Sequence, residues 1–121
     1  MEALGAEIVK FPKAIECCGS YQVLGNPEAA LKVSNDIITD ATAHGAEAMA
    51  LTCPLCDYNL GHRQEEMLKK YEGTKALPMF YFTQLMAVAL GVDPESYHLD
   101  LNQAVSREFL KGKNLLEKVS T

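Results

Sequence analysis

The chain has few basic residues and no long apolar run, and each absence excludes a class of protein. Lys and Arg together number 11 against 16 Asp and Glu, and the formal net charge is −5. Because no basic cluster is present to neutralise phosphates, a nucleic-acid partner is not expected. The longest apolar stretch, residues 85–92, is far shorter than the roughly 20 residues of a membrane-spanning helix. We therefore expect no membrane span.

The first residues lack the cationic segment and apolar run that mark a secretory signal peptide. This favours a cytoplasmic location, where thiols stay reduced and structural disulfides are not expected. Cysteines in the chain should therefore be available as metal ligands or redox groups. With 121 residues, of which 48% are hydrophobic and 22% charged, the chain corresponds to about one globular domain.

Short apolar runs alternate with helical patterns along the chain. Strands are predicted for three such runs, at residues 6–11, 48–51 and 78–82. Helices are predicted after them, at residues 26–44, 54–71 and 83–90. Strands that alternate with helices indicate parallel pairing with right-handed crossovers. We expect an α/β fold with three layers, α/β/α, around a small, mainly parallel sheet of three or more strands.

Four cysteines in two pairs are the most informative feature of the chain. Cys17 and Cys18 are adjacent and precede Gly19, and after 34 intervening residues come Cys53 and Cys56 in a Cys-x-x-Cys turn. Ligands of open parallel sheets gather beyond the carboxyl ends of the strands. The first predicted strand leads into the Cys17–Cys18 loop and the second ends at Cys53. Both pairs are therefore expected at one edge of the sheet.

Four convergent thiols fit three kinds of site. An iron–sulfur cluster is held mainly by thiolates, and Gly19 would let the backbone pass close to it. Zinc in a structural or assembly module without catalysis takes four thiolates in a tetrahedron, although adjacent cysteines suit one small ion poorly. A thioredoxin-like dithiol oxidoreductase would use only Cys53 and Cys56. The residues alone leave all three sites open.

The cysteine pattern resembles the cysteine-rich CCG domain. Residues 17–19 followed by Cys-Pro-Leu-Cys at residues 53–56 are similar to the second part of that domain in the B subunit of heterodisulfide reductase. Asn59-Leu60 and the segment at residues 77–85 resemble the same protein. The resemblance covers about residues 1–105 and implies the C-terminal module of that protein.

This resemblance implies an iron–sulfur redox subunit. The implied catalytic residues and ligands of a non-cubane [4Fe-4S] core are Cys17, Cys18, Cys53 and Cys56, with Gly19 also binding the cofactor. The family reduces the disulfide that joins coenzymes M and B in methanogenesis, or acts on related disulfides. The implied partners are a disulfide substrate and the other members of a heterodisulfide reductase-like complex, which are a second iron–sulfur protein and a flavin protein.

One departure from the family pattern concerns an additional upstream cysteine. None of the 16 residues that precede Cys17 is a cysteine. We therefore expect residues 1–121 to be the C-terminal part of a single CCG domain that lacks its first strand, its first helix and one ligand. Such a fragment would be inactive alone and would hold a cluster, zinc or no metal. Its unpaired sheet edge would be able to pair with a second copy.

Overall fold

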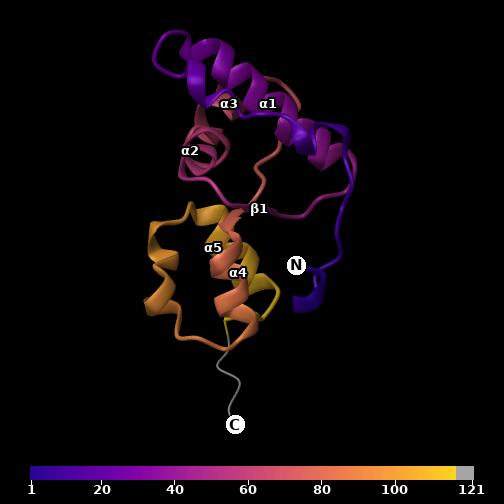
Figure 1. Ribbon diagram of the computed structural model, residues 1–121, viewed down its shortest axis with the longest axis vertical. Helices are drawn as coiled ribbons and strands as arrows, with labels where there is room; N and C mark the ends of the chain where they lie inside the picture. The colour runs from indigo at the N-terminus through magenta and orange to yellow at the C-terminus, as the bar shows by residue number, and fades with distance from the viewer. Residues whose placement is uncertain (117–121) are drawn as a thin grey trace.

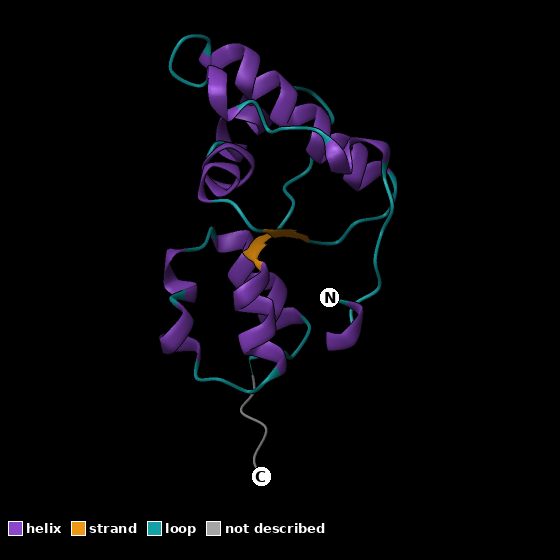
Figure 2. Ribbon diagram, in the orientation of Figure 1, coloured by secondary structure: helices purple, strands orange, loops and turns teal. Residues whose placement is uncertain are grey.

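The computed structural model describes residues 1–116 and contains a two-stranded parallel sheet between two groups of helices (Figures 1 and 2). β1 (Met49–Leu51) pairs with β2 (Met79–Tyr81), and Leu51 lies opposite Tyr81. Both strands run in the same direction, so the segments that follow Leu51 and Tyr81 leave the sheet at one edge. The expected α/β class, with parallel strands, is confirmed.

Helices cover both faces of this small sheet. On one side lie α1 (Pro27–Ala43), α2 (Pro54–Cys56) and α3 (Gln64–Lys70), and on the other lie α4 (Phe82–Ala89) and α5 (Ala104–Gly112) (Figure 1). Short 3-10 turns complete the described chain: η1 (Glu2–Leu4), η2 (Pro12–Ile15), η3 (Ser20–Gln22), η5 (Pro94–Tyr97) and η6 (Leu99–Leu101). In residues 1–116, no helix is both long enough and apolar enough to cross a membrane.

The two faces of β2 build two separate hydrophobic cores. Met79 packs into a core with Ile38 and Met67, whereas the next residue, Phe80, packs into a core with Leu110. This follows from strand geometry, because successive side chains point to opposite faces of a sheet. Met79 and Phe80 are both fully buried, as expected for a strand that is covered on both sides. The sheet is therefore the middle of three layers.

The strand predicted at residues 6–11 is not formed. This segment is extended but pairs with neither strand, and Ile8 is exposed. A strand needs a neighbour to satisfy its backbone groups, and β1 pairs only with β2 in the part of the chain that the structure describes. The predicted sheet of three or more strands is therefore wrong for residues 1–116, and the sheet has two.

Helix α1 forms close to the predicted bounds because its start and end signals are local. The Asn26 side chain accepts a hydrogen bond from the Ala29 N–H, Pro27 occupies the first helical position, and Gly45 follows the helix with φ +90°. One detail differs from the pattern. Asn35 is a polar residue, yet it is buried and accepts a hydrogen bond from the Thr74 hydroxyl.

The single helix predicted at residues 54–71 is divided into three segments. The short α2 continues into a π-helical segment, η4 (Asp57–His62), and α3 starts only after a break at Arg63. Such wider turns are rare and occur frequently at functional sites. The π-helical segment begins directly after Cys56, so its unusual backbone belongs to the region of the cysteines.

Candidate metal centre

The two cysteine pairs meet in the folded chain. The sulfur atoms of Cys18 and Cys56 are 3.5 Å apart, although 38 positions separate the residues in sequence. Cys18 is buried, with 2% of its surface exposed, and Cys56 is half-buried. The expected convergence is confirmed for these two thiols. It does not depend on a strand before Cys17, because the described chain has none there.

Packing on α1 brings the Cys17–Cys18 loop to this position. The Ser34 hydroxyl, on the buried side of α1, donates a hydrogen bond to the Cys18 carbonyl at 2.8 Å. Gly19 has φ +85°, and a Cβ atom built there would lie 3.1 Å from the Ala30 Cα atom. In this structure Gly19 thus permits a left-handed turn and a close approach to α1. Contact of Gly19 with a cofactor stays a prediction.

The Cys-x-x-Cys segment forms the turn that starts α2. Backbone N–H groups of Cys56 and Leu55 point to the Cys53 sulfur and lower the pKa of that thiol, while a charge on Cys17 acts in the opposite direction. The Cys56 thiol behaves differently. Burial, together with its hydrogen bond to the Cys18 sulfur, raises its pKa to about 12. One turn therefore holds a more acidic thiol and a shielded, weakly acidic one.

The Cys17 thiol is exposed and also acidic. The backbone N–H groups of Gly19 and Ser20 lower its pKa. Adjacent side chains diverge, so Cys17 faces solvent while Cys18 points inward. The charge of Cys17 nevertheless acts on Cys53, which indicates that these two acidic thiols belong to the same neighbourhood as the buried contact.

The four thiols fit the chemistry of an iron–sulfur or zinc centre, but they are not closed around one point. Two thiolates of a tetrahedral metal lie about 3.8 Å apart when the metal–sulfur bonds are about 2.3 Å. The 3.5 Å between Cys18 and Cys56 is close to that value. In residues 1–116, however, no three Cys, His, Asp or Glu side chains are placed to hold a single ion. The donors are therefore present as pairs.

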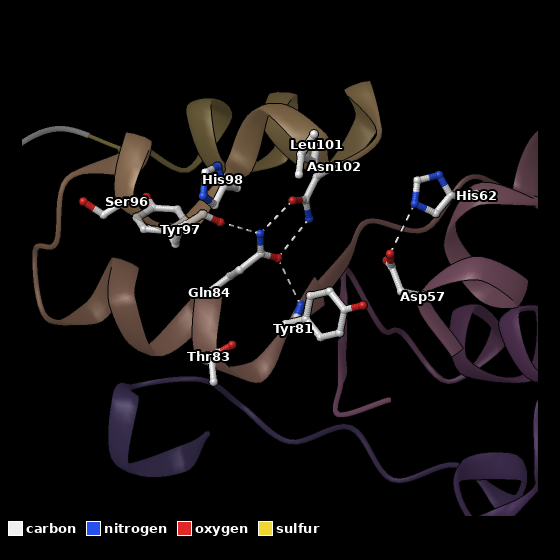
Figure 3. A pocket seen from close by; sticks show the side chains of 10 residues that line it. All are labelled: Asp57, His62, Tyr81, Thr83, Gln84, Ser96, Tyr97, His98, Leu101 and Asn102. Carbon is white, nitrogen blue, oxygen red and sulfur yellow. Dashed lines mark hydrogen bonds and ion pairs between the residues drawn. The ribbon is translucent and has the colours of Figure 1, made fainter. Parts of the chain in front are cut away.

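A cavity of about 690 Å³ lies between η4 and the segments around α4 and η6 (Figure 3). Asp57, the residue after Cys56, lines it and pairs with His62 at 3.2 Å. Tyr81 also lines it, and burial together with nearby Asp57 and cysteine charges raises the Tyr81 pKa. The Tyr81 side of the cavity thus lies within electrostatic range of the turn that carries Cys53 and Cys56.

A carboxamide network forms one wall of this cavity. Gln84 accepts a hydrogen bond from the Tyr81 N–H at 3.1 Å and donates to the Asn102 side chain at 2.7 Å (Figure 3). Asn102 in turn donates to the Met79 carbonyl. These bonds connect β2, α4 and the chain after η6, so the wall is held by the fold.

Sequence reasoning did not find two parts of this site. Ser34 anchors the Cys18 carbonyl, and its signal was a hydroxyl residue within the otherwise apolar face of a helix. The Asp57–His62 pair is the second, and five-residue spacing brings side chains together on a π-helical turn rather than on an α-helix. No regular helical pattern would have indicated that pair.

The chain belongs to the cysteine-rich domain family, whose CCG model matches residues 1–61. That match contains all four cysteines and ends within the π-helical segment. The family resemblance suggested by the sequence is therefore confirmed.

Similar proteins carry the names of reductase components. The 8-methylmenaquinol:fumarate reductase membrane anchor subunit of Wolinella succinogenes is 32% identical over 84% of this chain and 36% of its own length. A protein like the heterodisulfide reductase B subunit, from Archaeoglobus profundus, is 31% identical over 78% of this chain and 32% of its own. The B subunit of the ferredoxin:CoB-CoM heterodisulfide reductase of Methanosarcina mazei is 24% identical over 91% of this chain and 37% of its own length. The chain thus spans about a third of the length of these relatives.

Proposed function

We propose that this chain is an iron–sulfur redox module of a heterodisulfide reductase-like complex. Its proposed ligands are Cys17, Cys18, Cys53 and Cys56. When bound, a [4Fe-4S] core supplies single electrons for the cleavage of a disulfide. The non-cubane form of the core is part of this proposal and rests on the resemblance to the family.

The contact between Cys18 and Cys56 carries the proposal. It joins the Cys-Cys-Gly loop to the Cys-x-x-Cys turn with a separation near that of two thiolates on one metal. The arrangement in two pairs also matters, because adjacent cysteines diverge and suit a core of several metal ions better than a single ion. This supports a cluster over structural zinc.

Substrate and partners are proposed from the relatives. Two of them are a heterodisulfide reductase B subunit and a protein like it, so we propose a disulfide substrate, either the coenzyme M–coenzyme B heterodisulfide or a related one. The partners would be the other members of such a complex, a second iron–sulfur protein and a flavin protein. The chain's own residues would hold the core and wall the cavity that Tyr81 and Asp57 border.

A dithiol oxidoreductase that uses only Cys53 and Cys56 is the second candidate. It is favoured by the contrast between the lowered pKa of Cys53 and the raised pKa of Cys56, which is typical of a nucleophilic and a resolving thiol. A dithiol mechanism does not explain why the Cys56 sulfur contacts the Cys18 sulfur. A Cys18→Ser variant separates the candidates, because a dithiol enzyme would keep its activity.

Anaerobic reconstitution of the 121-residue chain with iron and sulfide tests the main proposal. We expect a brown protein with iron and acid-labile sulfide in near-equal amounts, and their loss in Cys18→Ser and Cys56→Ser variants. A Ser34→Ala variant is the control, because it removes a neighbour of Cys18 without removing a thiol. Zinc binding without acid-labile sulfide would instead favour the structural zinc module, and a chain that takes up no metal would contradict both.

A further inference from the structure

Asn59 is a buried amide that contacts the Cys18 sulfur from the π-helical segment. Only 1% of its surface is exposed, and its Nδ2 atom lies 3.6 Å from the Cys18 sulfur. We propose that Asn59 is a positioning residue that holds the Cys18 sulfur in its ligating position by donating its side-chain N–H to that sulfur. This inference rests on the proposed metal role of Cys18.

Two donors converge on one sulfur atom. The Cys18 sulfur accepts from the Asn59 amide and from the Cys56 thiol. When Cys56 binds a metal it loses its proton, and the Asn59 N–H is then the donor that remains at the Cys18 sulfur among these contacts. An N–H donor beside a ligating sulfur stabilises the thiolate and the more reduced, more negative state of a cluster.

The other end of the same amide shows that its orientation is specific. The Asn59 Oδ1 atom is buried and has no hydrogen-bond partner among residues 1–116. Leaving a buried acceptor unpaired costs about 1–3 kcal/mol. Once Cys18 has lost its proton to ligate a metal, a rotated amide would place this oxygen against the thiolate, so that two acceptors would face each other and the N–H contact would be lost. In the observed orientation the Asn59 oxygen has no hydrogen-bond partner among residues 1–116, while the Asn59 N–H donates to the Cys18 sulfur.

The backbone explains how a residue so close to Cys56 reaches Cys18. Asn59 lies in η4 (Asp57–His62), where the wider π-helical turn begins immediately after Cys56. Leu60 and Gly61, the next two residues, are buried with it. The segment therefore turns inward against the Cys18 loop and carries the amide with it.

Co²⁺ titration of the reduced 121-residue chain tests this role, because thiolate-to-cobalt charge-transfer bands report sulfur ligation directly. Two variants are compared with the parent chain. Asn59→Leu keeps the branched outline of the side chain but removes the donor, and Asn59→Asp keeps the shape but replaces the donor with a negative oxygen. We expect both variants to weaken Co²⁺ binding by about 10–100-fold, the usual effect of losing an outer-shell partner of a metal ligand.

Asn35→Leu is the matched control. Asn35 is another buried asparagine, and its amide oxygen accepts from Thr74 rather than contacting a cysteine. We expect its variant to lose stability in urea but to keep Co²⁺ affinity within about twofold of the parent chain, far less than the 10–100-fold effect of an outer-shell partner. In the iron-loaded chain, Asn59→Leu should shift the reduction potential to more negative values, whereas Asn35→Leu should not.

The outcomes separate the two proposals. Full Co²⁺ affinity in both Asn59 variants would overturn the role of Asn59 and leave the cysteine site intact. Weakened binding in Asn59→Leu with normal binding in Asn59→Asp would also overturn it, because packing and not the N–H would then matter. A parent chain that shows neither thiolate-to-cobalt bands nor uptake of iron and sulfide would overturn the cysteine site itself, and the role of Asn59 with it. In a parent chain that takes up iron and sulfide but no cobalt, the reduction potentials of the iron-loaded variants decide the role of Asn59, and equal potentials in the parent chain and Asn59→Leu would overturn it.

Discussion

Cys17 and Cys53 differ from Cys18 and Cys56 in what surrounds their sulfur atoms. The first residue of each pair has backbone N–H groups directed at its sulfur, and these lower its pKa. The second residue of each pair points inward, and the two inward sulfurs are in contact. Each half of the cysteine site therefore has one thiol whose pKa is lowered by backbone N–H groups and one whose sulfur contacts the other half.

Alkylation should distinguish the outer thiols from the inner ones. The thiolate is the reactive form, so the lowered pKa values of Cys17 and Cys53 predict fast reaction of the metal-free chain with iodoacetamide near neutral pH. Cys18 should react slowly because it is buried, and Cys56 because its pKa is about 12. Peptide mass spectrometry at successive times gives the four rates.

The pH dependence of the same reaction has a defined sign. The raised pKa of Cys56 keeps it protonated at neutral pH, so its labelling rate should keep increasing as the pH rises above the ordinary thiol value of 9.0 toward 12. Urea should abolish the differences between sites and serves as the control. Equal labelling of Cys56 and Cys53 in the folded chain at neutral pH would contradict the structure.

The elements around the site show how far local signals reach. Asn26-Pro27-Glu28 and Gly45 determine α1 because caps act within one turn. The segment after Pro54 begins and ends as predicted, but its interior contains the π-helical turn. A single π-helical turn inside a helical segment changes the spacing of only a few residues, so the periodicity of residues 54–71 does not reveal it.

Gln64 connects three of these elements through one buried carboxamide. It donates to the carbonyls of Leu60 and Leu77, both at 2.8 Å, and accepts from the Leu77 N–H at 2.9 Å. The π-helical segment, α3 and the approach to β2 are thereby held together. Removing this side chain would leave three buried backbone groups without these hydrogen bonds.

A Gln64→Leu substitution should therefore destabilise the chain by about 2–4 kcal/mol, because each unsatisfied buried group costs about 1–3 kcal/mol and partial relaxation recovers some of it. Urea denaturation followed by circular dichroism measures this. Gln103→Leu is the matched control, since both polar side-chain atoms of Gln103 are buried without a partner among residues 1–116. Its variant should be as stable as the parent chain or more stable, and equal losses in both variants would contradict the interpretation.

At the scale of the whole molecule, one sulfur contact joins segments that the sheet does not join. The Cys18 loop packs on α1, whereas Cys56 follows β1, and no strand before Cys17 adds a second connection in the described chain. A metal or cluster bound by both segments would close the chain between them. Binding should therefore stabilise the folded state, since an unfolded chain does not hold the four thiols together.

Metal loading is expected to raise the free energy of unfolding by about 2.7 kcal/mol when free metal is at about 100 times its dissociation constant. Urea denaturation with and without reconstituted iron and sulfide measures the gain, and a chelator should reverse it. Affinity should fall as the pH is lowered, because ligation must displace thiol protons, most of all that of Cys56 with its pKa of about 12. A Cys18→Ser/Cys56→Ser chain should show no gain, and an equal gain there would place the metal elsewhere.

The amino-acid sequence by itself determined the α/β class, the positions of α1, β1, β2 and α4, and the convergence of the Cys-Cys-Gly loop with the Cys-x-x-Cys turn. These depend on caps, apolar runs and residue spacing, which act over a few neighbouring positions. Only the tertiary structure decided that residues 6–11 form no strand, that Cys18 rather than Cys17 meets Cys56, and that Asn59 faces the Cys18 sulfur. Those outcomes depend on packing between segments about 40 positions apart in sequence. Local sequence patterns do not indicate which side chains such packing turns inward.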